Sequence, residues 1–421
     1  MKRELLSFIK SSPSCFHAIE NIKSILNVNG YSEVYESEPW HLEAGNKYYV
    51  VRSDSSIISF EVPKAQPTAY IIASAHSDSP TFKIKENAEK IIGEYTKLET
   101  EKYGGMLMST WFDRPLSMAG RIVINGENGI ESRLVYIDRD LLIIPSVAIH
   151  MNRNANDGVK IAANVDTIPL FGDASAKGKF LKIIAESADV SESDILSYDL
   201  FLCCRDEGTL LGCNEEYIAS PKLDDLECAF GCVKGLINSK SSNAIKVCAI
   251  FDNEEVGSET KQGAASSFLR DTLRRIANAL SIDEEGFQCL MAKSFMVSAD
   301  NAHAIHPNHP EYSDANNAPV MNGGIVIKYN ANQRYSTDAI SAAFFKNVCK
   351  KADVCVQSFA NRSDMLGGST LGSIANTLVP VKTVDIGLAQ LAMHSAFETA
   401  GANDICDFIK AMTVYFEENS I

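Results

Sequence analysis

The feature that most constrains this chain of 421 residues is an apolar run that ends in a histidine and an aspartate. Residues 70–75 predict a buried β-strand, and His76 and Asp78 follow at its end. Side chains two residues apart along a strand point to the same side, so these two are expected to lie together. A carboxylate beside an imidazole commonly orients a histidine that ligates a metal ion. A lone histidine is more often a core residue, and the neighbouring Asp78 favours the metal-binding interpretation.

Apolar strand patterns followed by helical patterns recur along the chain. Strands are expected near residues 48–51, 56–62, 244–251, 295–298 and 383–387, and helices near residues 4–28, 262–280 and 395–415. This alternation predicts an α/β fold with a two-sided, mainly parallel central sheet.

Residues 92–215 differ from this pattern, because they combine short alternating strands with turn signals such as Asn125-Gly126. We therefore expect a discontinuous main domain of residues 1–91 and 216–421, interrupted by a β-rich inserted domain of residues 92–215.

Composition argues against one class of partner and indicates a compartment. The chain has 54 acidic and 39 basic residues and a formal net charge of −15, which argues against non-specific binding of nucleic acid. The eleven cysteines are scattered and several fall in apolar patterns, as expected for reduced, buried thiols. The N-terminus lacks the apolar core of a signal peptide, and no run approaches membrane-spanning length. We expect a cytoplasmic protein.

Two acidic doublets lie next to predicted helices or strands. Asp224 and Asp225 precede a helical pattern, where an aspartate could cap the helix or bridge two cations. Glu254 and Glu255 follow the predicted strand at 244–251, where a solvated acidic turn is the alternative. Adjacent carboxylates at a sheet edge are costly unless positive charge is near. One of the two glutamates could bind metal while the other acts as a general base.

The remaining candidate ligands are Asp300, which closes the strand at 295–299, and His394, which follows the strand at 383–387. Together with His76, Asp224 and Glu255 they supply two imidazoles and three carboxylates. This donor set suits two divalent ions, with zinc first and cobalt or manganese as alternatives. Open α/β sheets place ligands beyond the carboxyl ends of their strands, where these residues are expected.

Several segments, in order along nearly the whole chain, resemble the aspartyl aminopeptidase and vacuolar aminopeptidase I family of dinuclear zinc exopeptidases. The segments that carry the resemblance are residues 75–80, 109–114, 148–150, 223–224, 252–258, 297–303 and 389–395.

The resemblance implies a role for each matching residue. His76, Asp224, Glu255, Asp300 and His394 would be the metal ligands, with Asp224 bridging. Asp78 would orient His76, and Glu254 would be the general base. The inserted domain would mediate dimerisation, and His150 would reach the active site of a neighbouring subunit. Lys328 would recognise acidic N-terminal side chains, and the assembly would be a homododecamer built from dimers.

The resemblance also implies that peptides with a free N-terminus are the substrates. The loop at residues 363–370 keeps an aspartate and the glycines around Gly368, which we expect at the substrate site, but its middle differs from the pattern of acidic-specific members. Acidic N-terminal residues are the expected preference, with neutral or broad specificity as an alternative. Rival interpretations are a carboxypeptidase or N-acyl deacylase on the same scaffold, or an assembling scaffold protein with a vestigial site.

Overall fold

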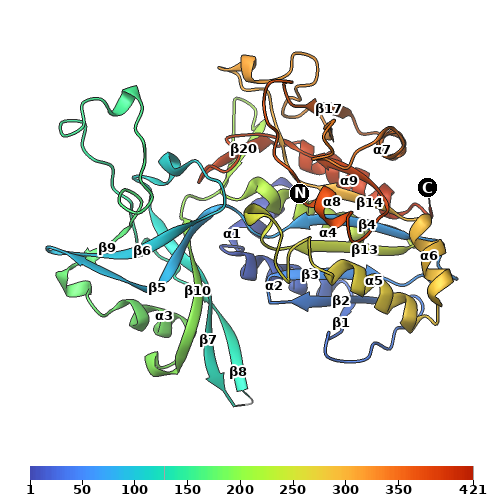
Figure 1. The fold of residues 1–421 in the computed structure, drawn as a ribbon, viewed down its shortest axis with the longest axis horizontal. Coiled ribbons are helices and arrows are strands. Elements are labelled where there is room, and N and C mark those ends of the chain that lie inside the picture. Colours follow the sequence, from blue (N-terminus) through green and yellow to red (C-terminus); the bar gives the residue numbers. More distant parts are fainter. Residues whose placement is uncertain (128, 421) are drawn as a thin grey trace.

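A computed structural model describes residues 1–127 and 129–420. Its largest element is a nine-stranded sheet with helices on both faces, drawn on the right of Figure 1. In spatial order the strands are β1 (Tyr31–Glu33), β2 (Lys47–Arg52), β3 (Ser56–Glu61), β13 (Ile245–Phe251), β4 (Tyr70–His76), β14 (Phe295–Ala299), β18 (Lys382–Gly387), β16 (Ile325–Tyr329) and β17 (Val356–Ala360).

Parallel pairing dominates the centre of this sheet, as the sequence predicts. Strand β4 lies between β13 and β14 and runs parallel to both, and β14 also pairs in parallel with β18. The antiparallel pairs are β2–β3, β3–β13 and β16–β18. Because β13, β4 and β14 point the same way, their carboxyl ends meet at one edge of the sheet.

Each face of the sheet has its own apolar core. Along β4, Ile71, Ala73 and Ala75 pack into one cluster, and Tyr70 and Ile72 pack into the other. The first cluster includes α1 (Lys2–Lys10), α2 (Cys15–Val28), α4 (Leu223–Asn238), α7 (Ala339–Lys351) and α9 (Asp404–Phe416); the second includes α5 (Phe268–Ala279), α6 (Glu284–Ala292) and α8 (Leu371–Ala375). This burial on both faces explains the nearly continuous apolar runs in the sequence.

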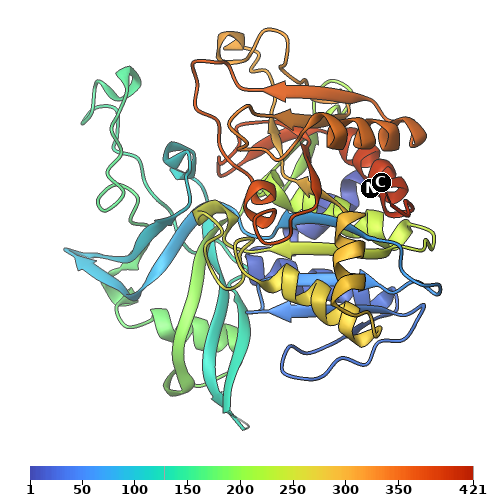
Figure 2. The same cartoon turned by 45° about the vertical axis from the view of Figure 1, so that its right-hand side comes forward.

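A six-stranded antiparallel sheet stands beside the main sheet, as Figure 1 and the rotated view in Figure 2 both show. Its strands in spatial order are β8 (Gly129–Tyr136), β7 (Leu116–Gly126), β10 (Ile195–Cys204), β5 (Thr81–Ile92), β6 (Tyr95–Tyr103) and β9 (Leu170–Asp173), with α3 (Phe180–Ala188) packed against them. In chain order the first strand of this sheet is β5, which begins at Thr81, directly after the His76–Asp78 segment. The division of the chain at residues 92 and 215, and a dimerisation role for the insertion, stay predictions.

A smaller sheet of β11 (Thr209–Leu211), β12 (Tyr217–Ser220), β20 (Glu398–Gly401), β19 (Ala389–Leu391) and β15 (Ala302–His303) completes the fold. Two helix boundaries differ from the sequence prediction, because α5 begins at Phe268 and α9 at Asp404. Within the described residues, no helix has both the length and the apolar character needed to cross a bilayer.

Candidate metal centre

The carboxyl edge of the main sheet gathers the residues that the sequence predicts as ligands. His76 is the last residue of β4, Glu254 and Glu255 form a 3-10 turn after β13, and Asp300 follows β14. Since these three strands are parallel neighbours, the side chains converge although the sequence separates them widely.

Asp224 lies at the start of α4 and faces two histidines at once. Its Oδ1 is 3.7 Å from Nε2 of His76, and its Oδ2 is 3.3 Å from Nε2 of His394. Nε2 of His394 is also 3.3 Å from Oε2 of Glu255. One carboxylate therefore turns an oxygen toward each imidazole, which is the geometry a bridging ligand between two cations needs.

The candidate donor atoms fall into overlapping groups, within each of which they lie no more than 4.8 Å apart. One group combines His76, Asp224, Asp225 and Asp300, and another combines Asp224, Glu255 and His394, so that Asp224 is shared. Glu254 joins His76 and Glu255 in a third. The sequence-predicted ligands are thus brought together.

This cluster concentrates negative charge in a buried place. Burial and neighbouring carboxylates raise the pKa of Glu254 to about 8 and that of Glu255 well above its ordinary value. Burial alone would raise the pKa of Asp224, but the His394 hydrogen bond and the His76 charge hold it below its usual value. So many carboxylates in one buried site need positive charge to remain ionised.

The donor set fits divalent cations. Oδ1 of Asp224 and Oε1 of Glu255 are buried and have no hydrogen-bond partner within the part of the chain that the structure describes. Buried oxygens are ordinarily paired, so oxygens of this kind, directed into a cluster of imidazoles and carboxylates, are suited to metal ions.

Asp78 lies behind His76, as the sequence predicts. Nδ1 of His76 lies 3.1 Å from the main-chain carbonyl oxygen of Asp78 and 3.3 Å from its Oδ1, which leaves Nε2 directed at the cluster. Asp78 also accepts hydrogen bonds from the main-chain N–H groups of Glu254 and Glu255, each at 3.2 Å, and from the Tyr103 hydroxyl at 2.7 Å. A single carboxylate thus connects the β4 histidine to the glutamate turn.

The other predicted site residues, Lys328, Gly368 and His150, differ in exposure. Lys328 in β16 is 2% exposed, so it is not a solvated surface lysine. Its Nζ donates to the carbonyls of Asp300 at 2.6 Å and Asn301 at 3.1 Å. Gly368 is exposed, and a Cβ there would meet no described atom within 4 Å. His150 is exposed in the segment between β8 and β9.

Sequence reasoning missed two residues that hold the cluster. Asp225 is fully buried, and its Oδ2 accepts a hydrogen bond from the main-chain N–H of His76 at 3.1 Å. Glu398 accepts from the N–H of Asp224 at 3.0 Å and from that of His394 at 2.7 Å. The doublet Asp224-Asp225 was a signal for the first, whereas nothing in the local pattern indicates the second.

Comparison with known proteins decides the family. The family model described as aminopeptidase I zinc metalloprotease (M18) matches residues 8–416. The chain belongs to the M18 aminopeptidases. A probable M18 family aminopeptidase 2 of Clostridium novyi is 46% identical over 410 residues, covering 95% of each chain.

Solved structures agree with M18 membership. The chain resembles one in a cryo-EM structure of an Ape4 and Nbr1 complex, with a TM-score of 0.95, 34% identity, and coverage of 99% of this chain and 85% of the other. It also resembles an S. cerevisiae mApe1 dodecamer, with a TM-score of 0.87, 26% identity, and coverage of 99% and 96%. The expected zinc exopeptidase fold and the expected family are confirmed, and this M18 protein is a metal-dependent aminopeptidase.

Proposed function

We propose that this M18 enzyme removes N-terminal residues from peptides with two divalent cations, zinc foremost, held by His76, Asp224, Glu255, Asp300 and His394. The observation that carries the proposal is the position of Asp224, whose two oxygens face two different imidazoles. Cations bound there would supply Lewis acidity that polarises the scissile carbonyl and makes a water molecule easier to deprotonate.

The chain's own part in the chemistry centres on Glu254. Its Oε2 is 4.0 Å from Nε2 of His76, at the mouth of the cluster, and its side chain is 14% exposed. The Glu254 carboxylate would take a proton from the attacking water and deliver it to the leaving amine. Burial raises the pKa of Glu254 to about 8, and positive charge beside it would lower that value toward the working pH.

Glu254→Gln tests this role. Since general base catalysis contributes roughly 10²–10⁴-fold, turnover is expected to fall by that order while metal content stays unchanged. Glu259→Gln, an exposed glutamate on the same turn region, is the matched control. Near-normal turnover of Glu254→Gln with metal bound would remove Glu254 from the mechanism.

We further infer a preference for acidic N-terminal residues, supported by the positive charge of Lys328. Burial would lower its pKa, but Asp300 beside it raises the pKa above the ordinary range, so the ammonium stays charged. Initial rates are measured on aminoacyl anilides from acidic to basic, each with a free and a blocked amine. They give the preference for the N-terminal side chain and the requirement for a free amine. Faster cleavage of neutral than of acidic substrates would favour broad specificity instead.

Self-association is the third part of the proposal. The segment that carries His150 exposes apolar side chains, with Val147 60% and Met151 83% exposed. A partner subunit covering this segment, with His150 entering its active site, fits these exposed side chains. Together with the dodecamer described for S. cerevisiae mApe1, they support a homododecamer, which light scattering of the purified protein would measure.

A further inference from the structure

The six-stranded sheet reaches the metal centre through one side chain. Tyr103 is the last residue of β6, and its hydroxyl donates a hydrogen bond to Oδ2 of Asp78 at 2.7 Å. The same hydroxyl oxygen accepts a hydrogen bond from Nδ2 of Asn253 at 2.8 Å. Tyr103 therefore completes a chain of contacts that runs from the six-stranded sheet through Asp78 to His76.

The backbone fixes the place of this phenol. Gly104, the next residue, has a φ of +77° and lies so close to Glu255 that an added Cβ would be 3.1 Å from the glutamate Cβ. Farther along, the N–H of Leu107 donates to the carbonyl of His394 at 3.0 Å. The segment after β6 thus runs directly along the metal centre.

Packing alone does not hold Asp78. A cavity of about 290 Å³ lies between the two sheets, and Asp78, Tyr103 and Asn253 are among the residues that line it. A side chain bordering a cavity lacks contact atoms on that side, so its hydrogen bonds carry more of the restraint on its orientation. Of the hydrogen bonds that Asp78 accepts, the one from Tyr103 is the shortest.

We propose that Tyr103 is a positioning residue: its hydroxyl fixes Asp78 and, through Asp78, aims Nε2 of His76 at a bound metal ion. The inference rests on the metal site of the proposed function. By it the six-stranded sheet contributes to metal binding without supplying a ligand. The competing explanation is purely structural, since the ring of Tyr103 also packs against Phe201 with centroids 5.5 Å apart.

Tyr103→Phe separates the two explanations because it removes the hydroxyl and keeps the ring. The measurement is the rate at which the zinc-loaded, fully assembled protein releases metal to a chromogenic chelator. Loss of the outer partner of a ligating histidine costs roughly 10–100-fold, and Tyr103 acts one contact farther out, so release is expected to accelerate on the order of 10-fold. Tyr198→Phe is the matched control, since that hydroxyl, in the same sheet, donates to the carbonyl of Lys85 at 2.8 Å.

A double-mutant cycle tests whether Tyr103 acts through Asp78. In the Asp78→Ala background the phenol has no carboxylate to hold, so adding Tyr103→Phe should leave the release rate unchanged. Additive effects, or equal release by Tyr103→Phe and Tyr198→Phe, would overturn the proposal.

Two further measurements keep the outcome clear. Phe201→Leu loosens the packing of the phenol ring and keeps its hydroxyl, so it should accelerate metal release less than Tyr103→Phe does; equal acceleration by the two variants would favour the purely structural explanation. Wild-type protein that binds no zinc would refute the proposed function itself, whereas tight binding by wild type and Tyr103→Phe alike would refute only the role of Tyr103.

Discussion

His17, near the start of α2, combines a partly buried imidazole with a specific hydrogen bond. Its Nδ1 lies 2.8 Å from Oγ of Ser14. Burial, followed by the charge of Lys222, lowers the pKa of His17 from 6.5 to about 4. The unfolded chain therefore binds more protons than the folded protein between these two values, and stability is expected to fall as the pH falls through that window.

His17→Asn should remove this acid sensitivity while keeping a polar partner for Ser14. Because one pKa unit corresponds to about 1.4 kcal/mol, the wild type is expected to lose about 2 kcal/mol more than the variant between neutral pH and the lower end of the window, allowing for partial exposure. Urea unfolding at both pH values measures the difference. Parallel pH dependence in the two proteins would show that His17 does not titrate on unfolding.

Among individual residues, the sequence identifies those site residues whose role follows from their neighbours along the chain. His76, Glu255 and Asp300 each end an apolar strand pattern, so parallel pairing is enough to bring them together. Glu398 and Tyr103 could not be found in this way, because Asp224 and Asn253, with which they form hydrogen bonds, lie far away along the chain, and no strand or helix pattern marks either residue. Hydrogen bonds between sheets leave no periodic signal in a sequence.

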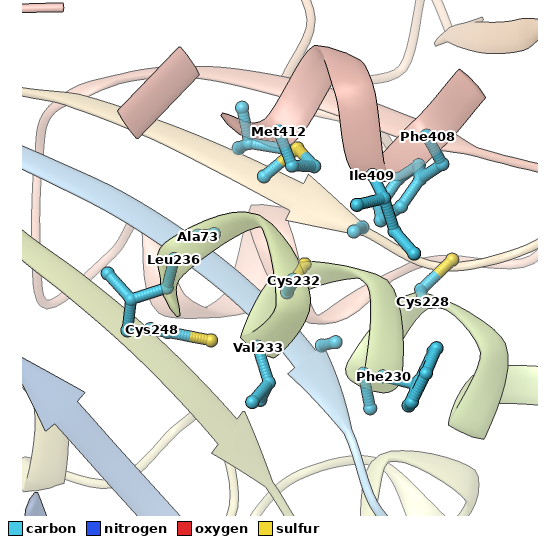
Figure 3. Packing of buried hydrophobic residues seen from close by; sticks show 14 of the residues in the cluster. Ala73, Cys228, Phe230, Cys232, Val233, Leu236, Cys248, Phe408, Ile409 and Met412 are labelled. Carbon is cyan, nitrogen blue, oxygen red and sulfur yellow. The ribbon is translucent and has the colours of Figure 1, made fainter. Parts of the chain in front are cut away.

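Between elements, glycine permits a close approach where α4 packs on α9 over one face of the main sheet, shown in Figure 3. Gly231 in α4 faces the ring of Phe408 in α9, and an added Cβ would overlap that ring. Gly231→Ala is expected to destabilise the protein by about 1–3 kcal/mol despite the better helix propensity of alanine, because overpacking forces the helices apart.

Phe408→Leu supplies the control for this helix contact. Alone it should also destabilise, because it removes buried ring atoms, but in the Gly231→Ala background it makes room for the new methyl group. The two changes together should therefore cost less than the sum of their separate effects on the free energy of unfolding. If the two changes in the free energy of unfolding simply added, the methyl group of Gly231→Ala would not contact Phe408.

A strand buried on both faces is easier to predict from the sequence than a helix that begins next to the site. Runs such as Ile245–Phe251 are buried on both faces and were predicted closely from their apolar residues. The start of α5 was predicted too early, because residues 254–267 form a short 3-10 helix and turns that place the glutamates rather than extend the helix. At that point the geometry of the site overrides local propensity.

At the scale of the whole molecule, the metal centre joins segments spread along most of the chain, since its proposed ligands come from β4, from the turns after β13 and β14, from α4 and from the segment after β19. Ions bound there would link segments that lie far apart in the sequence and would stabilise only the folded state. At 100 times the dissociation constant, one such ion contributes about 2.7 kcal/mol. Chelation is therefore expected to abolish activity and to lower the thermal midpoint by several degrees, with both restored by added zinc.

A variant that lacks a ligand gives the control for this expectation. His76→Ala should have a low thermal midpoint whether or not a chelator is present, because the site it disrupts no longer contributes to stability. Differential scanning fluorimetry of both proteins, with and without chelator, measures the effect together with the zinc released. An equal chelator-induced shift in wild type and His76→Ala would place the stabilising ions elsewhere in the molecule.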